Sequence, residues 1–548
     1  MKFNFPALVL AAILCCTACV DRNYELGGSL IPVDQTYKIY RDTVFLTGSN
    51  AGVVSNRIAD SLSGYSNTRI TIGAIRDEHD RLTTRACAMT LVPMYDSVLN
   101  MGTNRVYQGF KMIALRDSVS MADKTQANIL QNVRVYELEK ALDPAKDFDC
   151  NAPVAHKDNI LSKGIPVVGE KSNLIIRFND EYGKRLLELE DSDVHDMDTY
   201  LAKFPGIYIE TDKPEGQGGR IDIFDLQLAY SSDSGISGNF AELDFNAYFP
   251  DEGKSKDTTL LFYFGTLDFY DVDSLLTNSS SGSYPQYALN LTTQESEDLE
   301  GTPGKTIYCE GGGGLKPVIS AKGIRDIAAD LISAKGGDPA GTVINKASLV
   351  FPFEYDPAKY EEAFKYPDLL SPTCRIRTDT TSVFMGLTDS SSDDENQGDI
   401  DRFNLVYAPD ITYHMQELLK MDDKKLDSGN YDIWLLNMSN EVVTTTSSSS
   451  SSDLSEYYQY LAYQQYYNSM YGGYGYGSYG YSSYGYGNSY SNYYSYMLMM
   501  SMYSSSSSTT TSTETQLDKD RYYWGELCGP QSDNPPMLIL TYSIPNSK

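Results

Sequence analysis

Alternation of apolar and polar residues is the feature of this sequence that most restricts its fold. The alternating segments are rich in Val, Ile, Tyr, Phe and Thr and are bounded by Gly, Pro, Asn and Asp. A period of two is typical of half-buried β-strands, because successive side chains of a strand point to opposite faces. Strands are expected at residues 37–48, 68–75, 86–95, 133–138, 173–178, 220–231, 240–249, 258–269, 342–355, 374–385, 403–407, 431–438, 521–527 and 537–544. Many short strands at close intervals favour antiparallel sandwiches over a parallel α/β sheet.

We therefore predict an all-β, mainly antiparallel protein with two β-sandwich or jelly-roll-like domains and a few short packed helices. A Ser/Asp/Gly run at residues 231–239 is typical of a boundary. It places an N-terminal β-sandwich at residues 37–232 and a C-terminal β-sandwich at residues 238–545. Residue types and spacing predict helices at residues 180–190, 321–335 and 410–421, the last with Asp410 as its N-cap.

A long low-complexity segment of Tyr, Gly and Ser interrupts the expected C-terminal sandwich at residues 444–516. Strand-like segments flank it on both sides, so we expect a disordered insertion at a hairpin tip, without the aliphatic residues that form a core. One interpretation is a contact loop that binds glycans, proteins or copies of itself, because Tyr suits contact surfaces. The other is low-complexity expansion in a tolerant loop tip. The contact loop would act through Tyr471, Tyr474, Tyr476, Tyr479, Tyr481, Tyr484 and Tyr486.

The first eighteen residues resemble a bacterial lipoprotein signal peptide. Lys2 supplies a positive charge, the apolar stretch at residues 8–14 is too short to span a bilayer, and Thr17 and Ala18 stand directly before Cys19. We expect a lipidated Cys19, carrying acyl chains such as palmitate, and a tether at residues 19–36. The alternative is an ordinary signal peptide cleaved after Ala18. The prediction is an outer-membrane lipoprotein that faces either the periplasm or the cell surface.

Charge and cysteine usage argue against several partners. The formal net charge is −30 and no cluster of Lys and Arg forms a basic patch, which argues against nucleic acid. Five of the eight cysteines follow the signal region without the spacing of a zinc site: Cys87, Cys150, Cys309, Cys374 and Cys528. One or two long-range disulfides stay open, but buried thiols are favoured. We expect no cofactor.

No motif predicts a catalytic centre. The four histidines, His79, His156, His195 and His414, lack metal-ligand spacing and are expected at the surface or at its boundary. The run Gly311–Gly314 lacks the Lys and Ser/Thr of a phosphate loop, which favours a tight turn. Paired carboxylates for sugar hydrolysis stay open, because their separation is a spatial property.

An acidic loop at residues 389–401 is a weak candidate for Ca²⁺. Its ligands would be Asp393, Asp394, Glu395, Asp399 and Asp401. The loop fails the EF-hand pattern, because Asn404 stands where the bidentate Glu would be. A solvated acidic loop is the favoured interpretation.

Seven triplets of Asp, Ser or Thr, and an apolar residue or Thr resemble the O-glycosylation sequon of exported Bacteroidota proteins. The candidate acceptors are Thr43, Ser61, Ser97, Ser118, Thr258, Ser274 and Thr380. The same triplets also suit the entry from a turn into a strand, and the two interpretations are compatible.

Several short motifs occur in an order that resembles a known family. They are Gly27-Gly28-Ser29-Leu30-Ile31-Pro32, Ile72-Gly73-Ala74-Ile75-Arg76-Asp77, Val133-Arg134-Val135-Tyr136-Glu137-Leu138 before Leu142-Asp143, Gly312-Gly313-Gly314-Leu315, and Leu538-Ile539-Leu540-Thr541-Tyr542-Ser543. In these motifs the chain resembles the Bacteroidota lipoprotein family known as domain of unknown function 4270, over nearly the whole mature chain except the Tyr-rich insertion. The resemblance implies an envelope lipoprotein with jelly-roll-like sandwiches, and it implies no activity and no catalytic residues.

Our first hypothesis is a non-enzymatic envelope lipoprotein that binds an outer-membrane barrel protein, as an accessory subunit, or a glycan. The first rival is a carbohydrate hydrolase, which turnover of a polysaccharide would reveal. The second rival is an adhesin or assembly protein that acts through the Tyr-rich loop, which deletion of that loop would test.

Overall fold

The computed structural model describes residues 36–48, 51–66, 68–95, 98–121, 129–143, 148–164, 173–226, 228–231, 235–265, 281–283, 286–354, 365–377, 382–391, 396–446 and 509–546. Every strand pairing found among these residues is antiparallel. The prediction of an all-β, mainly antiparallel protein with a few short helices is confirmed.

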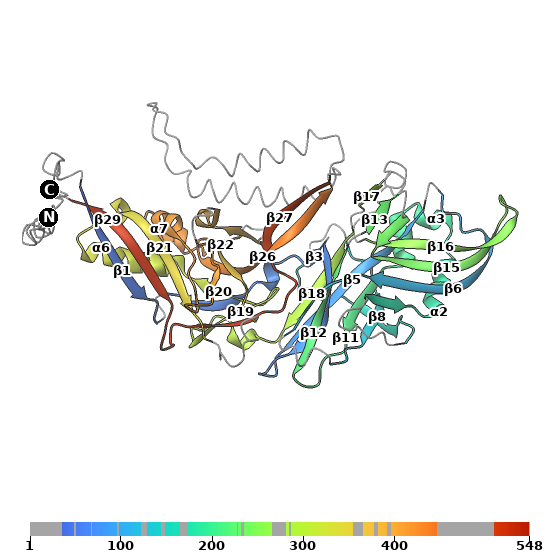
Figure 1. The fold of residues 1–548 in the computed structure, drawn as a ribbon, viewed down its shortest axis with the longest axis horizontal. Helices are drawn as coiled ribbons and strands as arrows, with labels where there is room; N and C mark the ends of the chain where they lie inside the picture. The colour runs from blue at the N-terminus through green and yellow to red at the C-terminus, as the bar shows by residue number, and fades with distance from the viewer. Residues whose placement is uncertain are drawn as a thin grey trace, which may run out of the picture.

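The strands form two lobes that lie side by side along the long axis of the molecule (Figure 1). The middle lobe takes its strands from residues 65–294, and the terminal lobe takes its strands from both ends of the chain. The middle lobe contains β3 (Tyr65–Ser66), β4 (Arg69–Arg76), β5 (Leu82–Met94), β6 (Thr103–Ala114), β7 (Arg116–Ser120), β8 (Val133–Leu138), β9 (His156–Ile160), β10 (Leu174–Arg177), α2 (Asp180–Leu187), α3 (Asp191–Val194), α4 (Met197–Lys203), β11 (Ile207–Thr211), β12 (Gly218–Asp225), β13 (Leu228–Ser231), β14 (Gly235–Gly238), β15 (Phe240–Phe249), β16 (Lys254–Gly265), β17 (Ser281–Ser283) and β18 (Ala288–Gln294).

The terminal lobe is built on two main sheets. One has the order β1-β29-β21-β25-β24, and the other has the order β2-β20-β26-β22-β23 with β27 paired to β26. Its elements are β1 (Tyr37–Phe45), β2 (Val54–Arg57), η3 (Ala59–Ser61), η5 (Glu297–Leu299), β19 (Thr306–Glu310), β20 (Leu315–Ile319), α6 (Ala321–Ala334), η6 (Pro339–Gly341), β21 (Val343–Pro352), β22 (Leu369–Arg377), β23 (Ser382–Gly386), η8 (Thr388–Ser391), β24 (Ile400–Asp401), β25 (Val406–Tyr407), α7 (Thr412–Leu418), α8 (Asp423–Leu426), β26 (Ile433–Thr446), β27 (Thr509–Leu517), β28 (Trp524–Cys528) and β29 (Met537–Pro545).

The boundary expected at residues 231–239 does not separate the lobes. β15 follows that run, yet it pairs with β6, and β16 pairs with β5, so residues 240–265 belong with the earlier strands. The Ser/Asp/Gly run instead falls within one strand pair, because it contains β14 and the last residue of β13, which pair with each other. Its composition suits a hairpin turn as well as a domain boundary. The expected sandwiches at 37–232 and 238–545 are therefore wrong in extent, also because β1 and β2 pair with the late strand β29 and with β20.

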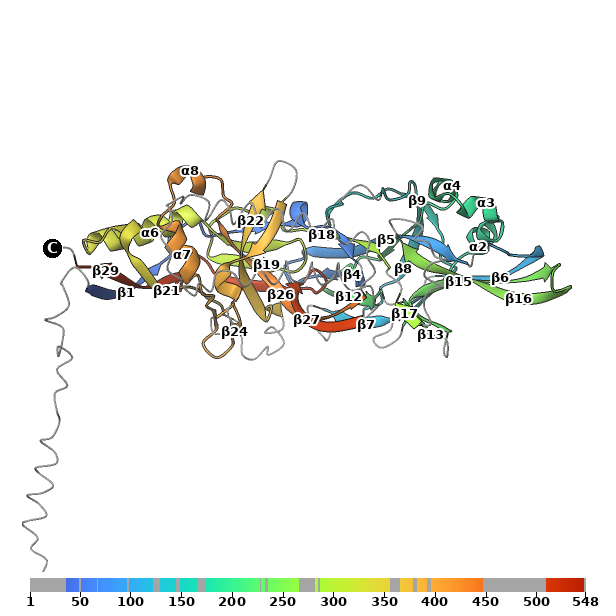
Figure 2. The ribbon, with the colours of Figure 1, turned by 90° about the horizontal axis from the view of Figure 1, so that it is seen from above.

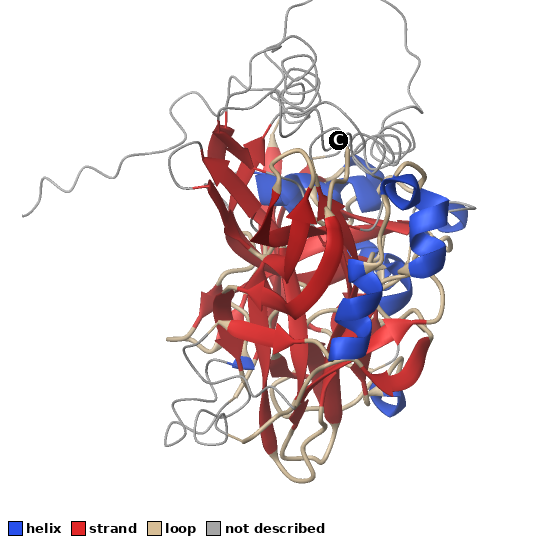
Figure 3. Ribbon diagram, turned by 90° about the vertical axis from the view of Figure 1, so that its right-hand side faces the viewer, coloured by secondary structure: helices blue, strands red, loops and turns tan. Residues whose placement is uncertain are grey.

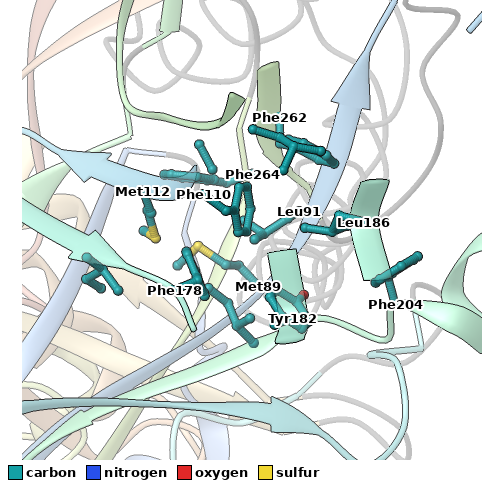
Figure 4. Close-up of a cluster of buried hydrophobic side chains, with 14 of the residues drawn as sticks. Met89, Leu91, Phe110, Met112, Phe178, Tyr182, Leu186, Phe204, Phe262 and Phe264 are labelled. Atoms are coloured by element: carbon teal, nitrogen blue, oxygen red, sulfur yellow. The ribbon is translucent and has the colours of Figure 1, made fainter. Parts of the chain in front are cut away.

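An aromatic and aliphatic core fills the middle lobe (Figure 4). Phe110 stacks on Phe178 with ring centroids 4.5 Å apart and meets Phe262 edge-on at 5.5 Å. Tyr182 and Leu186 of α2 pack into the same cluster. Asn179 caps α2, and its side chain accepts from the Tyr182 backbone N. The expected helix at 180–190 is confirmed by α2.

A second core joins the two sheets of the terminal lobe to its helices. Leu538, Leu540 and Tyr542 of β29 are fully buried in one cluster with Ile324 of α6 and Ile433 of β26. Most helices lie along one side of the strands (Figure 3). The expected helix at 321–335 is confirmed by α6.

Two local expectations need correction. The helix near residue 410 begins at Thr412, and Ile411 is its N-cap; Asp410 stands one residue earlier, where its carboxylate accepts from Thr412 N at 2.9 Å. The single strand expected at residues 374–385 is the end of β22, a connection and β23, and the two strands pair with each other.

The hairpin of β26 and β27 bounds the low-complexity insertion. Its register runs from Met438 opposite Leu517 to Thr446 opposite Thr509, so the segment between these threonines is inserted within one hairpin, as expected. The flanking Thr-rich runs extend the two strands, which moves the limits of the insertion from 444–516 to 447–508.

Candidate functional site

A turn of four glycines lies at the junction between the lobes. Gly311–Gly314 connects β19 to β20, and Gly314 N donates to Gly311 O at 3.2 Å, which confirms the expected tight turn. A Cβ at Gly312 would collide with the Arg85 guanidinium, and a Cβ at Gly313 would lie 2.7 Å from Cys150 Sγ. Arg85 and Cys150 belong to the middle lobe. Side chains of one lobe therefore occupy the space that glycines of the other lobe leave.

Charged side chains are buried at the same junction. Glu310 Oε2 accepts from Ser296 Oγ at 2.8 Å and from Leu315 N at 2.7 Å, and Lys316 Nζ donates to the backbone O of Glu310. Burial raises the pKa of Glu310 and lowers the pKa of Lys316. A buried charge that is left without a partner destabilises the folded state strongly. Buried charges with fixed partners therefore favour one arrangement of the surrounding elements. This group therefore holds the junction together.

A pocket of about 370 Å³ opens beside the junction. Its lining combines three arginines, two asparagines, two carboxylates, one alanine and one indole: Asn56, Arg57, Ala59, Asp60, Asn151, Glu300, Arg375, Arg377 and Trp434. β2, η3, β22 and β26 contribute most of these side chains, and Asn151 comes from the middle lobe. The folded chain thus brings distant segments to one site.

Arg375 forms the fixed wall of the pocket, with a side chain that is 5% exposed. Its Nη2 donates to Asp60 Oδ1 at 2.9 Å, and its Nε donates to Ser382 Oγ at 2.9 Å. The guanidinium also lies 5.3 Å from the centre of the Trp434 ring and 5.7 Å from that of Phe384. Burial lowers the pKa of Arg375, and the carboxylate of Asp60 opposes that shift. Arg375 therefore positions Asp60 and the indole.

Three other polar side chains of the pocket are free to meet a ligand. Within the described residues, the side chains of Asn56, Asn151 and Arg377 make no hydrogen bond or ion pair. Arg57 is already engaged, because its side chain pairs with Glu297. These groups are two amides and one guanidinium, which together offer several hydrogen-bond donors.

The pocket is locally basic in an acidic protein. Three arginines against Asp60 and Glu300 leave its lining with a formal charge of +1, whereas the whole chain carries −30. A guanidinium binds a carboxylate through two parallel hydrogen bonds. Asp60 is exposed and paired with Arg375, unlike the apolar surroundings that tune a carboxyl group for acid catalysis. The arrangement suits binding of an anionic, hydroxyl-rich ligand.

The candidate glycosylation residues lie apart from one another. Ser61 lies at the pocket, where its hydroxyl contacts Arg375 and donates to Asp60 Oδ1 at 3.1 Å. Thr43 is exposed on β1, Ser118 is half-buried on β7, and the Thr258 Oγ1 on β16 is buried without a described partner. Ser97, Ser274 and Thr380 lie outside the described residues.

The acidic loop is only partly described. Asp393, Asp394 and Glu395 lie outside the described residues, and Asp399 and Asp401 lie within them. The Asp401 carboxylate accepts hydrogen bonds from Phe403 N and Asn404 N, both at 2.9 Å. Its hydrogen bonds with Asn404, and also the one with Phe403 N, lower the pKa of Asp401. Asp401 thus stabilises its own turn. In the described part of the chain, no group of three or more His, Cys, Asp or Glu is placed to hold a metal ion.

The five cysteines within the described residues are thiols. Cys87, Cys150, Cys309 and Cys374 are buried and Cys528 is half-buried, and none of them forms a disulfide among the described residues. The preference for buried thiols is thereby confirmed. Cys19 and the contact-loop tyrosines from Tyr471 to Tyr486 lie outside the described residues. In the part of the chain that is described, no helix has both the length and the apolar character to cross a membrane.

One histidine contradicts its expected surface position. His414 of α7 is 1% exposed, and its Nε2 lies 3.0 Å from Tyr431 O. Ile411, Met415 and Leu418 bury the same helix in the core, and His414 turns inward with them. His156 stacks on Tyr136 and Tyr208, with ring centroids 4.5 and 4.6 Å away.

The pocket arginines were not predicted from the sequence. Arg375 and Arg377 stand two residues apart on β22, where a strand places both side chains on one face. Trp434 is one of only two tryptophans in the chain. These two sequence features indicate part of the site, but neither of them predicts that Arg57 belongs to it.

Comparison with known proteins gives no relative on which to base a function. A scan against protein-family models found no match to this chain, and searches of curated proteins and of solved structures found none either.

Proposed function

We propose that the protein is a lipid-anchored lipoprotein of the outer membrane that binds a glycan without transforming it. The pocket at the lobe junction would receive a sugar that carries a carboxylate. The single observation behind this ligand class is a group of three side chains, Arg377, Asn56 and Asn151, that have no partner among the described residues and lie beside the indole of Trp434. The anchor is supported by the sequence around Cys19.

Each ligand group has a counterpart in the pocket. The carboxylate would accept hydrogen bonds from Arg377, and the sugar hydroxyls would bond to the two amides. The sugar ring would meet Trp434 only at the small part of the indole that lines the pocket, because this residue is 5% exposed. Because the rest of the protein is strongly acidic, a long polyanion is repelled and a single acidic residue at a chain end is favoured.

Calorimetry with short galactose oligosaccharides that end in a single galacturonate tests the ligand class, with fully uncharged galactose oligosaccharides of the same length beside them. We expect the acidic series to bind at least tenfold more tightly. Arg377→Ala should weaken that binding by about 10- to 100-fold, since a charge-assisted hydrogen bond contributes about 1.5–3 kcal/mol. Arg402→Ala removes an exposed arginine outside the pocket and should leave binding unchanged. Equal binding of both series, or an Arg377→Ala variant that binds normally, would refute the assignment.

The lipid anchor has its own test. Cells that express the protein with radiolabelled palmitate should yield a labelled membrane-bound chain, because two or more acyl chains hold a protein stably on a bilayer. Cys19→Ser should remove the label and release the protein into the soluble fraction. Retention of the label in Cys19→Ser would exclude this residue as the lipidation site.

A further inference from the structure

One face of the terminal lobe exposes apolar side chains on a regular sheet. On β1, alternate residues point outward, and among them Ile39 is 70%, Tyr37 56% and Phe45 54% exposed. Val343 on β21 is 44% exposed on the same sheet. Met537 and Ile539 of β29, paired with Phe45 and Thr43, lie between them. We call this surface the outer face of the terminal sheet.

The opposite face of the same strands is filled. Tyr40 stacks on Tyr542, and Leu538 and Leu540 are fully buried beneath α6. Seen from above, α6 lies on one side of the sheet of β1, β29 and β21, and no described element covers the other side (Figure 2). The exposed residues of β1 therefore have no partner within the described chain.

The charge of this face differs from that of the protein. Asp42 is the only acidic residue of β1, β21 and β29, although the chain as a whole carries −30. Asp42 accepts a hydrogen bond from Tyr542 Oη at 2.7 Å on the filled face. Arg41 points outward and forms no ion pair with a described residue, whereas Lys346 pairs with Asp410. Apart from the Asp410 carboxylate at Lys346, the outward groups are aliphatic, aromatic, hydroxyl and basic, and aliphatic, aromatic and basic side chains are typical of a membrane interface.

The position of β1 in the chain indicates what covers the face. Tyr37 begins the first strand after the tether that starts at Cys19. Fully extended, residues 20–36 reach at most about 60 Å, at about 3.5 Å per residue. The tether therefore keeps the terminal lobe close to the bilayer, and the strand that it enters carries the exposed apolar groups.

We infer that the outer face of the terminal sheet lies on the surface of the membrane that holds the anchor. Tyr37, Ile39 and Phe45 enter the headgroup region, and Arg41 meets lipid phosphates. This inference rests on the proposed lipid anchor. It adds a fixed orientation: the terminal lobe rests on the bilayer, and the tether only holds it there.

Depth-dependent quenching on liposomes tests this orientation with the full acylated chain. Ile39→Cys, in a Cys528→Ser background that removes the half-buried thiol, is labelled with an environment-sensitive fluorophore. The liposomes contain phosphatidylethanolamine, phosphatidylglycerol and a lipid with a nitroxide at the headgroup. Val106→Cys is the matched control, because Val106 is also a strand residue, 59% exposed, and lies on β6 of the middle lobe. Tyr37→Cys provides a second position on the outer face.

We expect the labels at positions 39 and 37 to be quenched at least threefold more than the label at position 106. Equal melting temperatures of the labelled proteins would show that each is folded. A protein that floats with the liposomes but shows equal quenching at all three positions would overturn the docked face and leave the anchor intact. A protein that does not float with the liposomes would overturn both.

Discussion

At the scale of single residues, burial decides which ionisable groups respond to pH. His414 sits in the terminal core with one ring nitrogen beside Tyr431 O and with Nδ1 lacking a described partner. Burial lowers the pKa of His414 from 6.5 to about 4. The folded chain therefore keeps this ring neutral at a pH where the unfolded chain protonates it. Helical spacing points to this burial, because His414 stands three residues after Ile411 and four before Leu418 and so shares their face.

The shift at His414 sets a direction for stability. Above pH 6.5 His414 is neutral in both the folded and the unfolded chain, so it does not lower the free energy of unfolding. Between pH 6.5 and about 4 only the unfolded state binds it, and the free energy of unfolding falls by about 1.4 kcal/mol per pH unit. Urea unfolding gives the free energy of unfolding at pH 7 and at pH 5. Between these two pH values it should fall by about 2 kcal/mol more for the wild type than for His414→Gln. His79→Gln, at a half-exposed position, serves as the control. Identical losses in wild type and His414→Gln would contradict the prediction.

Gly313 is a second residue whose surroundings fix its identity. A Cβ there would lie 2.7 Å from Cys150 Sγ and 2.9 Å from Ala59 Cα. Overpacking of this kind costs about 1–3 kcal/mol, so Gly313→Ala should lower the melting temperature by several degrees. Gly216→Ala has open space around its Cβ and should change stability by less than about 0.5 kcal/mol. Equal melting temperatures of the two variants would show that the junction accommodates the added methyl group without loss of stability.

At the scale of elements, alternation in the sequence was a good guide where a strand has one buried face. β8 and β15 have the bounds expected from their alternating residues, and their buried residues alternate. Alternation does not delimit a strand where both of its faces are buried or where a turn lies within the pattern. β22 is buried along most of its length, and β23 continues the same apolar pattern after the connection, so the sequence predicts one strand where the structure has two.

The β26–β27 hairpin predicts that the insertion is dispensable for folding. Thr446 and Thr509 are directly paired, and a two-residue Asn-Gly turn closes such a pair. Replacement of residues 447–508 by Asn-Gly should leave the melting temperature within about 2 °C of the wild type, since the deleted tract has only three leucines and no valine or isoleucine with which to form a core. Loss of a cooperative transition would contradict this. The same variant also tests the contact-loop hypothesis. Loss of association with glycans, proteins or other copies would show that the tyrosines mediate it, and unchanged association would refute the hypothesis.

At the scale of the whole molecule, the sequence could not predict which strands share a lobe. β1 and β29 are neighbours, and Asp42 and Tyr542 are 500 residues apart in the chain. Local alternation has no information about such a pairing. The pocket was missed for the same reason, because Arg57, Glu300 and Arg375 meet only after the lobes form.

The arrangement of the lobes predicts an asymmetry between chain fragments. Residues 63–295 contain the strands and the large core of the middle lobe, so this fragment should melt cooperatively and show a β-type circular dichroism spectrum. Residues 296–546 lack β1 and β2, which pair with β29 and β20, and should not melt cooperatively. A stable fold of the second fragment would show that β1 and β2 are accessory.

The pairing of β1 with β29 also sets an order of events during synthesis. β1 emerges first from the ribosome, and among the described strands its only partner is made last. The terminal sheet must therefore stay incomplete until the final residues of the chain emerge, whereas the middle lobe can fold earlier, since contacts distant in sequence form late. A nascent chain of this kind is kept open at one end by its own topology.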